Sequence, residues 1–137
     1  MRLDLDEIRA RIQTETGIDT GTALDRDFLS DFGKTLPKVW VVAQRLRPQN
    51  DGRIATGVFR QRVRVEIMVK ALVDRYAAGK ASADLNTEHD AVVDALVGWT
   101  PTGAIEELAL DASADGEPNE SYLVTDILFQ TEVIYEK

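Results

Sequence analysis

The feature that most constrains the fold is a strict alternation of apolar and polar side chains over residues 58–73. The apolar side chains of one face are Val63, Val65, Ile67, Val69 and Ala71. The positions between them include three arginines, Arg60, Arg62 and Arg64. Successive side chains of a β-strand point to opposite faces. A period of two therefore predicts a long strand with one face in the core and the other lined with arginine.

Further segments predict more strands. The β-branched and aromatic run at residues 38–43 is typical of a strand buried on both faces. Residues 105–110 predict a strand that stops at a turn over residues 114–119. The last predicted strand, 121–136, has carboxylates on its outer face, among them Glu132 and Glu136. That face is acidic where the outer face of residues 58–70 is basic.

Turn residues fill the segment after the strand at 38–43. Residues 45–57 contain the sequence Asn50-Asp51-Gly52, which favours the tip of a hairpin. The basic side chains of this segment are Arg45, Arg47 and Arg53. We therefore predict a long, basic, exposed hairpin loop here.

An amphipathic helix is predicted over residues 4–16, because Leu5, Ile8 and Ile12 share one face and Gly17 follows as a stop. Residues 18–36 favour nothing more definite than a short helical turn or an irregular segment.

A second helix is predicted to begin at Asp84 or Asn86 as its N-cap and to end at Gly98. Its apolar face consists of Leu85, His89, Val92, Val93, Leu96 and Val97. Together these elements predict an α+β fold, in which a mostly antiparallel mixed sheet has two main helices packed on one face and a long exposed hairpin loop. A length of 137 residues fits a single domain, 1–137.

Composition excludes several kinds of chemistry. The chain has no cysteine and one histidine, His89, which excludes disulfides, thiolate sites and multi-histidine metal sites. We expect the neighbours Glu88 and Asp90 to point away from His89, which favours a structural histidine. Neither a phosphate-binding loop nor a serine-nucleophile motif is present, and the acids of residues 111–120 lack the spacing of a calcium loop. We expect no catalysis, cofactor or metal.

The chain also lacks membrane signals. No apolar run reaches the roughly 20 residues of a membrane helix, and the N-terminus lacks the regions of a signal peptide. We therefore expect a soluble protein that is made in the cytoplasm and has no membrane partner.

The net charge of −8 is unevenly distributed. Residues 33–73 sum to +7, whereas residues 1–32 sum to −4 and residues 74–137 to −11. This pattern is compatible with a solvated mixed surface, or with unlike charges that meet between strands or between copies. The arginines could bind phosphates, but the acidic remainder repels DNA and no base-stacking platform is evident. Specific nucleic-acid recognition is therefore disfavoured.

Three segments together resemble a known family. They are residues 56–63 at the start of the alternating strand, residues 92–101 at a helix end, and residues 129–135. Their order and spacing resemble tail-terminator and related minor tail proteins of long-tailed bacteriophages, over most of the chain beyond about residue 37. The most specific element is Gly98-Trp99-Thr100-Pro101, a motif of structure and not of chemistry.

The resemblance implies a structural virion protein, assembled in the host cytoplasm, that forms a ring, commonly a hexamer. Such a ring caps the finished tail tube, meets the head-completion or head–tail connector protein, and lets genomic DNA pass without sequence-specific binding. Its partners are copies of itself, the tail tube protein and the connector. A ring closed by head-to-tail contacts needs two complementary surfaces on each subunit. The candidate interface residues are Arg45, Arg47, Arg53, Arg60, Arg62, Arg64, Trp99, Glu132 and Glu136.

The arginines of that set are expected to meet carboxylates such as Glu132 and Glu136, across strands or across subunits. Two alternative functions stay open. One is another neck or tail protein, such as a head-completion or tail-tube subunit. The other is a small enzyme or ligand-binding domain, which needs a concave site with convergent polar groups that the sequence does not indicate.

Overall fold

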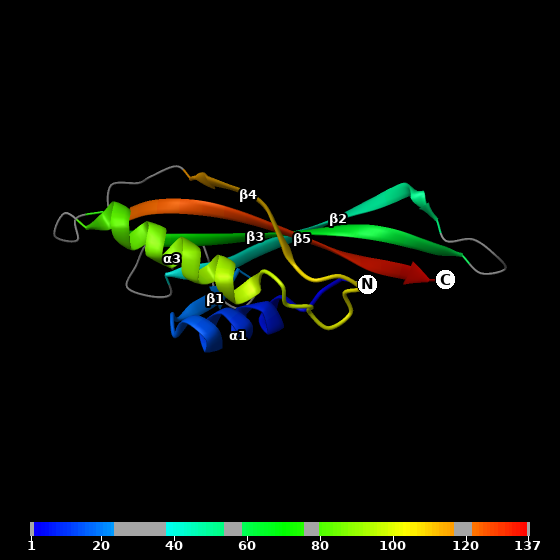
Figure 1. Cartoon of the computed structure of the whole chain (residues 1–137), viewed down its shortest axis with the longest axis horizontal. Helices are drawn as coiled ribbons and strands as arrows, with labels where there is room; N and C mark the ends of the chain where they lie inside the picture. The colour runs from blue at the N-terminus through cyan, green and yellow to red at the C-terminus, as the bar shows by residue number, and fades with distance from the viewer. Residues whose placement is uncertain (1, 24–37, 54–58, 76–79, 117–121, 137) are drawn as a thin grey trace.

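The computed structural model describes residues 2–23, 38–53, 59–75, 80–116 and 122–136. Within them lie two helices and five strands, in the order α1 (Leu5–Thr16), β1 (Thr20–Thr22), β2 (Val39–Arg53), β3 (Arg60–Asp74), α3 (Ala81–Leu96), β4 (Ala109–Asp115) and β5 (Tyr122–Glu136). The strands form one sheet in the order β1-β2-β3-β5-β4, in which only the β1–β2 pair is parallel. Both helices lie on one face of this sheet (Figure 1). The predicted α+β fold is confirmed.

The alternating segment forms β3, the central strand of the sheet. It pairs with β5 without a register shift from Arg60 opposite Glu136 to Asp74 opposite Tyr122. Every predicted core position of β3 is buried, and these side chains join α1, α3 and β5 in the main apolar cluster. The prediction from period two is therefore confirmed from Val63 to Ala71, and the alternation ends there because Leu72 and Val73 are both buried.

Helix α1 follows its prediction closely. The Asp4 carboxylate caps its first turn, and Gly17 ends it with a positive φ of 72°. Leu5, Ile8 and Ile12 are buried against the sheet. A glycine at that position adopts the left-handed conformation without the strain that a side chain brings.

The predicted start of the second helix was wrong. Helix α3 begins at Ala81, and its N-cap, Lys80, makes no side-chain capping bond. Asp84 therefore lies inside the first turn. The physical reason is burial, because Ala81 and Leu85 pack with Val73 in a small apolar cluster at this end of the sheet. Packing of an amphipathic face sets the helix start here in place of a side-chain cap.

Strand β2 is much longer than predicted. Residues 39–41 are buried, as expected, but residues 45–53 also belong to the strand and were wrongly predicted as loop. Their partners lie on β3, where Leu46 is opposite Val65 and Pro48 is opposite Val63. An edge strand tolerates proline and turn residues because one side of its backbone needs no ladder bonds. The remainder of the predicted loop, 54–57, lies outside the described residues.

Two edge strands differ from the sequence prediction. Strand β1 lies within residues 18–36, for which no strand was expected, and residues 24–36 of that segment lie outside the described residues. Strand β4 begins at Ala109, later than the predicted residue 105, and continues to Asp115 inside the predicted turn. All of its residues are exposed, so no apolar alternation marked its limits.

The C-terminal part of β2, the N-terminal part of β3 and the C-terminal part of β5 extend beyond the two helices (Figure 1). We call this extension the arm and define it as residues 45–53, 59–64 and 132–136. It contains eight of the nine candidate interface residues, since only Trp99 lies elsewhere.

Candidate assembly surfaces

The outer face of the arm carries ion pairs between β3 and β5. Arg60 lies opposite Glu136, and its Nε is 3.2 Å from the Glu136 Oε1. Arg62 reaches diagonally to Glu132, with 3.6 Å between Nη1 and Oε2. The predicted meeting of arginines with Glu132 and Glu136 thus occurs across strands within one chain.

A second set of charges joins β2 to β3. The Glu66 side chain is 13% exposed and lies between two arginines, with its oxygens 3.1 Å from the Arg47 Nε and 3.7 Å from the Arg45 Nε. A further ion pair joins β3 to β5, where the Lys70 Nζ is 2.6 Å from the Asp126 Oδ1. Opposite charges on neighbouring strands stabilise the pairing, although each exposed pair contributes little.

Arg64 differs from the other arginines of β3. It lies opposite Glu132, yet within the described residues no ion pair joins it to a carboxylate. It lines a cavity of about 210 Å³ together with Glu106, Glu107 and Gln130. The Glu132 Oε2 is buried and accepts no hydrogen bond from the described residues. The Arg64 charge is therefore available to a further partner, whereas Glu132 already forms an ion pair with Arg62.

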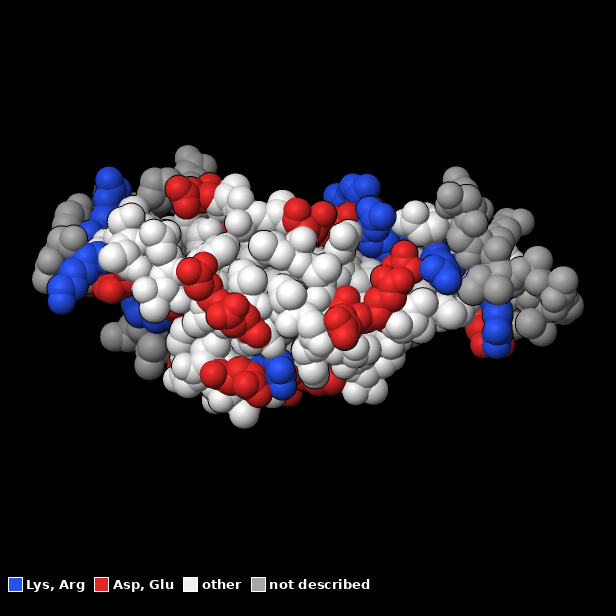
Figure 2. Space-filling model, in the orientation of Figure 1, with Lys and Arg blue, Asp and Glu red and all other residues white. Residues whose placement is uncertain are grey.

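Charged side chains of each sign gather in separate regions on one face of the molecule (Figure 2). On the face shown in Figure 2, basic side chains lie toward the arm and at the opposite end, and the middle is mainly acidic. The arm holds six arginines against three acids, and the Arg53 side chain lies outside the described set.

Trp99 is placed differently from the arginines. It lies in the loop after α3 and is half-buried against the main apolar cluster. The Arg11 guanidinium lies 5.4 Å from the centre of its ring, and the Arg11 Nε donates to the Ala95 carbonyl. Much of the Trp99 indole therefore stabilises the fold, through packing against the core and a cation–π contact with Arg11.

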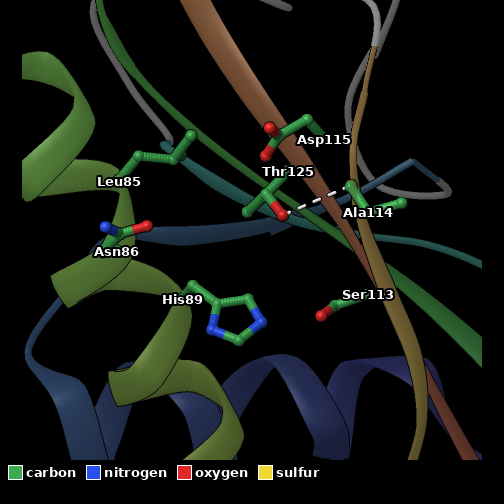
Figure 3. Close-up of a pocket in the computed structure, with 7 residues that line it drawn as sticks. All are labelled: Leu85, Asn86, His89, Ser113, Ala114, Asp115 and Thr125. Carbon is green, nitrogen blue, oxygen red and sulfur yellow. Dashed lines mark hydrogen bonds between the residues drawn. The ribbon is translucent and has the colours of Figure 1, made fainter.

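A polar cleft between α3 and β4 was not predicted. It has a volume of about 390 Å³ and is lined by Leu85, Asn86, His89, Ser113, Ala114, Asp115 and Thr125. Figure 3 shows His89 and Ser113 on opposite sides of this cleft. The His89 Nε2 is buried and has no partner among the described residues.

The expectation that Asp90 points away from His89 was wrong. The Asp90 Oδ1 lies 2.9 Å from the His89 Nδ1, because side chains of adjacent helical residues can still meet at the helix surface when one of them bends back. This contact is exposed, and it orients the imidazole of His89 so that the buried Nε2 lies on its inner side.

Glu88 is the titratable group whose pKa departs most clearly from its ordinary value. Burial raises the pKa of Glu88 from 4.5 to about 7, against an opposing effect of Lys38 and with a smaller contribution from Asp84. Sequence reasoning missed this group because helical periodicity placed it beside the apolar face and not on it.

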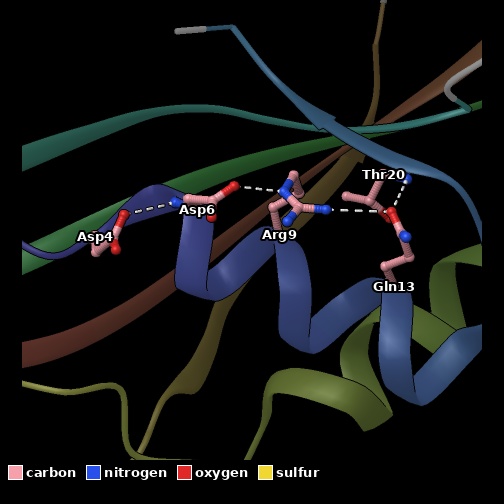
Figure 4. A network of polar contacts seen from close by, with 5 residues as sticks. All are labelled: Asp4, Asp6, Arg9, Gln13 and Thr20. Atoms are coloured by element: carbon pink, nitrogen blue, oxygen red, sulfur yellow. Dashed lines mark hydrogen bonds and ion pairs between the residues drawn. The ribbon is translucent and has the colours of Figure 1, made fainter. Parts of the chain in front are cut away.

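A polar network fastens α1 to the edge of the sheet (Figure 4). The Arg9 guanidinium contacts the Asp6 carboxylate at 2.6 Å and the Gln13 Oε1 at 3.3 Å. The same Gln13 oxygen accepts the backbone N–H of Thr20 in β1. The network therefore serves the fold and links the helix to a strand that lacks an apolar signature.

In the parts of the chain that the structure describes, no group of three or more histidine or acidic side chains could hold a metal ion. Over the same ranges, no helix is long and apolar enough to span a bilayer.

The face of the sheet away from the helices carries cross-strand ion pairs. Comparison with known families shows the class of this protein. The sequence matches the family model described as phage tail terminator protein over residues 1–137, and the chain therefore belongs to the phage tail terminator family. It is a structural protein of the virion tail.

The fold has a counterpart among solved structures. A chain of the structure titled "Virion of native gene transfer agent (GTA) particle" aligns with a TM-score of 0.64 and 17% identity, covering 98% of this chain and 96% of that one. At this identity the likeness concerns the fold. No curated protein sequence matches the chain.

Proposed function

We propose that this chain is a tail terminator subunit, a single domain that closes into a ring on the finished end of the tail tube and joins the tail to the head–tail connector. We propose a hexamer, the ring size common in the family. The family match over residues 1–137 carries this proposal. The subunit acts by assembly and not by catalysis.

The charges of the arm support a role in contacts between copies. A ring closed by head-to-tail contacts needs two different complementary surfaces, and a basic middle with acidic flanks supplies them. Arg60 and Arg62 are partly neutralised within the chain, whereas Arg64 is not paired with any described carboxylate. Arg64 therefore has the most charge to offer another copy.

The net charge suits a passage for DNA. A lumen that DNA crosses works better when it does not hold phosphates, and a subunit with a net charge of −8 repels them at a distance. The tail tube protein on one side and the connector on the other are the partners that this position implies.

The experiment is to measure the mass of the purified chain in solution and to image it alone and with tail tubes. A closed ring that binds one end of each tube supports the proposal. A strict monomer that never binds tube ends refutes it. Extended tubes built by the chain alone favour the alternative that it is a tube subunit.

The arginines are tested by reversing the charges of Arg62 and Arg64 together to glutamate. We expect the variant to fold and to lose ring formation or tube binding. The matched control is Arg2→Glu, which reverses an exposed arginine outside the arm. Full assembly of the double variant removes these two residues from the interface.

A further inference from the structure

The sheet has two unpaired edges on opposite sides. Among the strands that the structure describes, β4 ends the sheet on one side and pairs with β5 alone. On the other side, β1 covers β2 only at residues 39–41, and within the described residues no strand pairs with β2 beyond Val41. The Gln44 side chain bonds to the backbone of Leu3 and leaves the backbone edge of β2 unpaired there. Unpaired edges of this kind are templates for strands of other chains.

Strand β4 has an irregular register between Leu110 and Ala112 and a regular edge over residues 112–115. Its seven residues, ALDASAD, are all exposed and include neither lysine nor proline. Three of them are alanines, which leave room above the strand for long side chains of a neighbour. Native edges are commonly blunted by lysine, proline or a covering element.

The ladder fixes which backbone groups of β4 face outward. Gly116 donates to Val124, and the register places Ala114 opposite Asp126 in the same antiparallel ladder. Because hydrogen-bonded pairs alternate with non-hydrogen-bonded ones, the backbone groups of Ser113 and Asp115 point away from β5. These groups are the ones that a further strand can reach.

The two edges carry opposite charge. Residues 106–115 hold four acids, Glu106, Glu107, Asp111 and Asp115, and no basic side chain. The free part of β2, residues 43–53, holds Arg45, Arg47 and Arg53 against a single acid, Asp51. Pairing β4 with β4 of another copy sets acid against acid, and pairing β2 with β2 sets arginine against arginine. Only the mixed pair brings unlike charges together.

Strand direction supports the same pairing. Three successive antiparallel pairs separate β2 from β4, so the two strands run in opposite directions within one subunit. A ring related by rotation preserves strand directions, so β2 of one copy meets β4 of the next in antiparallel orientation. This orientation gives the more stable ladder, and opposite edges allow the contact to repeat until the ring closes.

We propose that the free edge of β2 in one copy pairs with β4 of a second copy, so that the sheet continues from subunit to subunit. This inference rests on the proposed ring and specifies its contact. Arg45 and Arg47, which contact Glu66 in their own chain, then lie close to the acidic edge of the neighbour and attract it at longer range, because the Asp115 side chain lines the cleft beside α3.

The test is Ser113→Pro, with Ser113→Ala as its matched control. Proline at this position removes an outward N–H and leaves the inward ladder to β5 in place, whereas alanine removes only the hydroxyl. We expect Ser113→Ala to form rings like the wild type and Ser113→Pro to sediment as a folded monomer with an unchanged circular dichroism spectrum. If Ser113→Pro forms as many rings as the wild type, the inference is overturned and the proposed function is unaffected.

A second backbone test keeps the inference testable if Ser113→Pro fails to fold. Asp115→Pro removes the other outward N–H of β4, and the matched control Asp115→Asn removes only the charge. We expect Asp115→Asn to form rings and Asp115→Pro to sediment as a folded monomer. Folded Asp115→Pro that forms as many rings as the wild type refutes the pairing. A wild type that neither forms rings nor binds tubes refutes the proposed function itself.

Discussion

Glu66 gives the sharpest test of how the arm is held together. Its side chain is 13% exposed and lies between the guanidinium groups of Arg45 and Arg47, at 3.7 and 3.1 Å. Glu66→Gln keeps the size of the side chain and removes the charge. Both arginines are about half exposed or more, so each pair is worth less than about 1 kcal/mol. We expect the free energy of unfolding to fall by about 1 kcal/mol in total.

Urea denaturation at low and high salt measures this loss. A change of about 1 kcal/mol lowers the melting temperature of a chain this long by about 3 °C, and the difference from the wild type shrinks at 1 M salt, where charges are screened. The matched control is Glu106→Gln on the exposed loop before β4, which is expected to change stability by less than about 0.5 kcal/mol. Equal stabilities of Glu66→Gln and the wild type at low salt refute the reasoning.

Three further predictions concern stability. Burial raises the pKa of Glu88 from 4.5 to about 7 in the folded chain. Between these pH values the folded chain binds more protons than the unfolded chain, so the free energy of unfolding falls as pH rises from about 5 to 8. Glu88→Gln is expected to flatten this fall in melts recorded across that range, and an unchanged slope contradicts the assignment. Phe129→Ala removes a fully buried ring and is expected to cost about 3–5 kcal/mol in urea, whereas Phe59→Ala, at 38% exposure, costs less than half as much. Equal losses contradict the placement of the core. Gly98→Ala is expected to cost about 1 kcal/mol by thermal melting because Gly98 has a φ of 85°, and no loss contradicts that conformation.

The sequence predicted the elements that bury a periodic apolar face. Strand β3, most of β5 and helix α1 were predicted because one face of each meets water and the other the core. In such elements the apolar residues recur with the period of the helix or strand, because only one face is buried. This periodicity can be recognised from a single sequence.

Edge elements were harder to predict. Strands β1 and β4 and the outer half of β2 gain their structure from backbone pairing with a neighbour, which depends little on residue type. Their residues therefore show turn or polar composition. The start of α3 at Ala81 was missed for a related reason, because packing against Val73 replaces the expected cap.

The charged set was predicted in part. Alternation placed Arg60 and Arg62 on one face and Glu132 and Glu136 on the facing strand, and the observed ion pairs follow. The role of Glu66 as the shared partner of two β2 arginines required the β2–β3 register, which depended on the unrecognised length of β2. The distinct position of Arg64 required the loop at Glu106 and Glu107.

The central claim is that copies of this chain assemble through their sheets into a ring at the end of the tail tube. Electron cryomicroscopy of tail tubes mixed with the purified chain tests it most directly. The account predicts a single closed ring at one end of each tube, with β2 of every subunit beside β4 of the next. Bare tube ends at saturating concentrations of the chain contradict it.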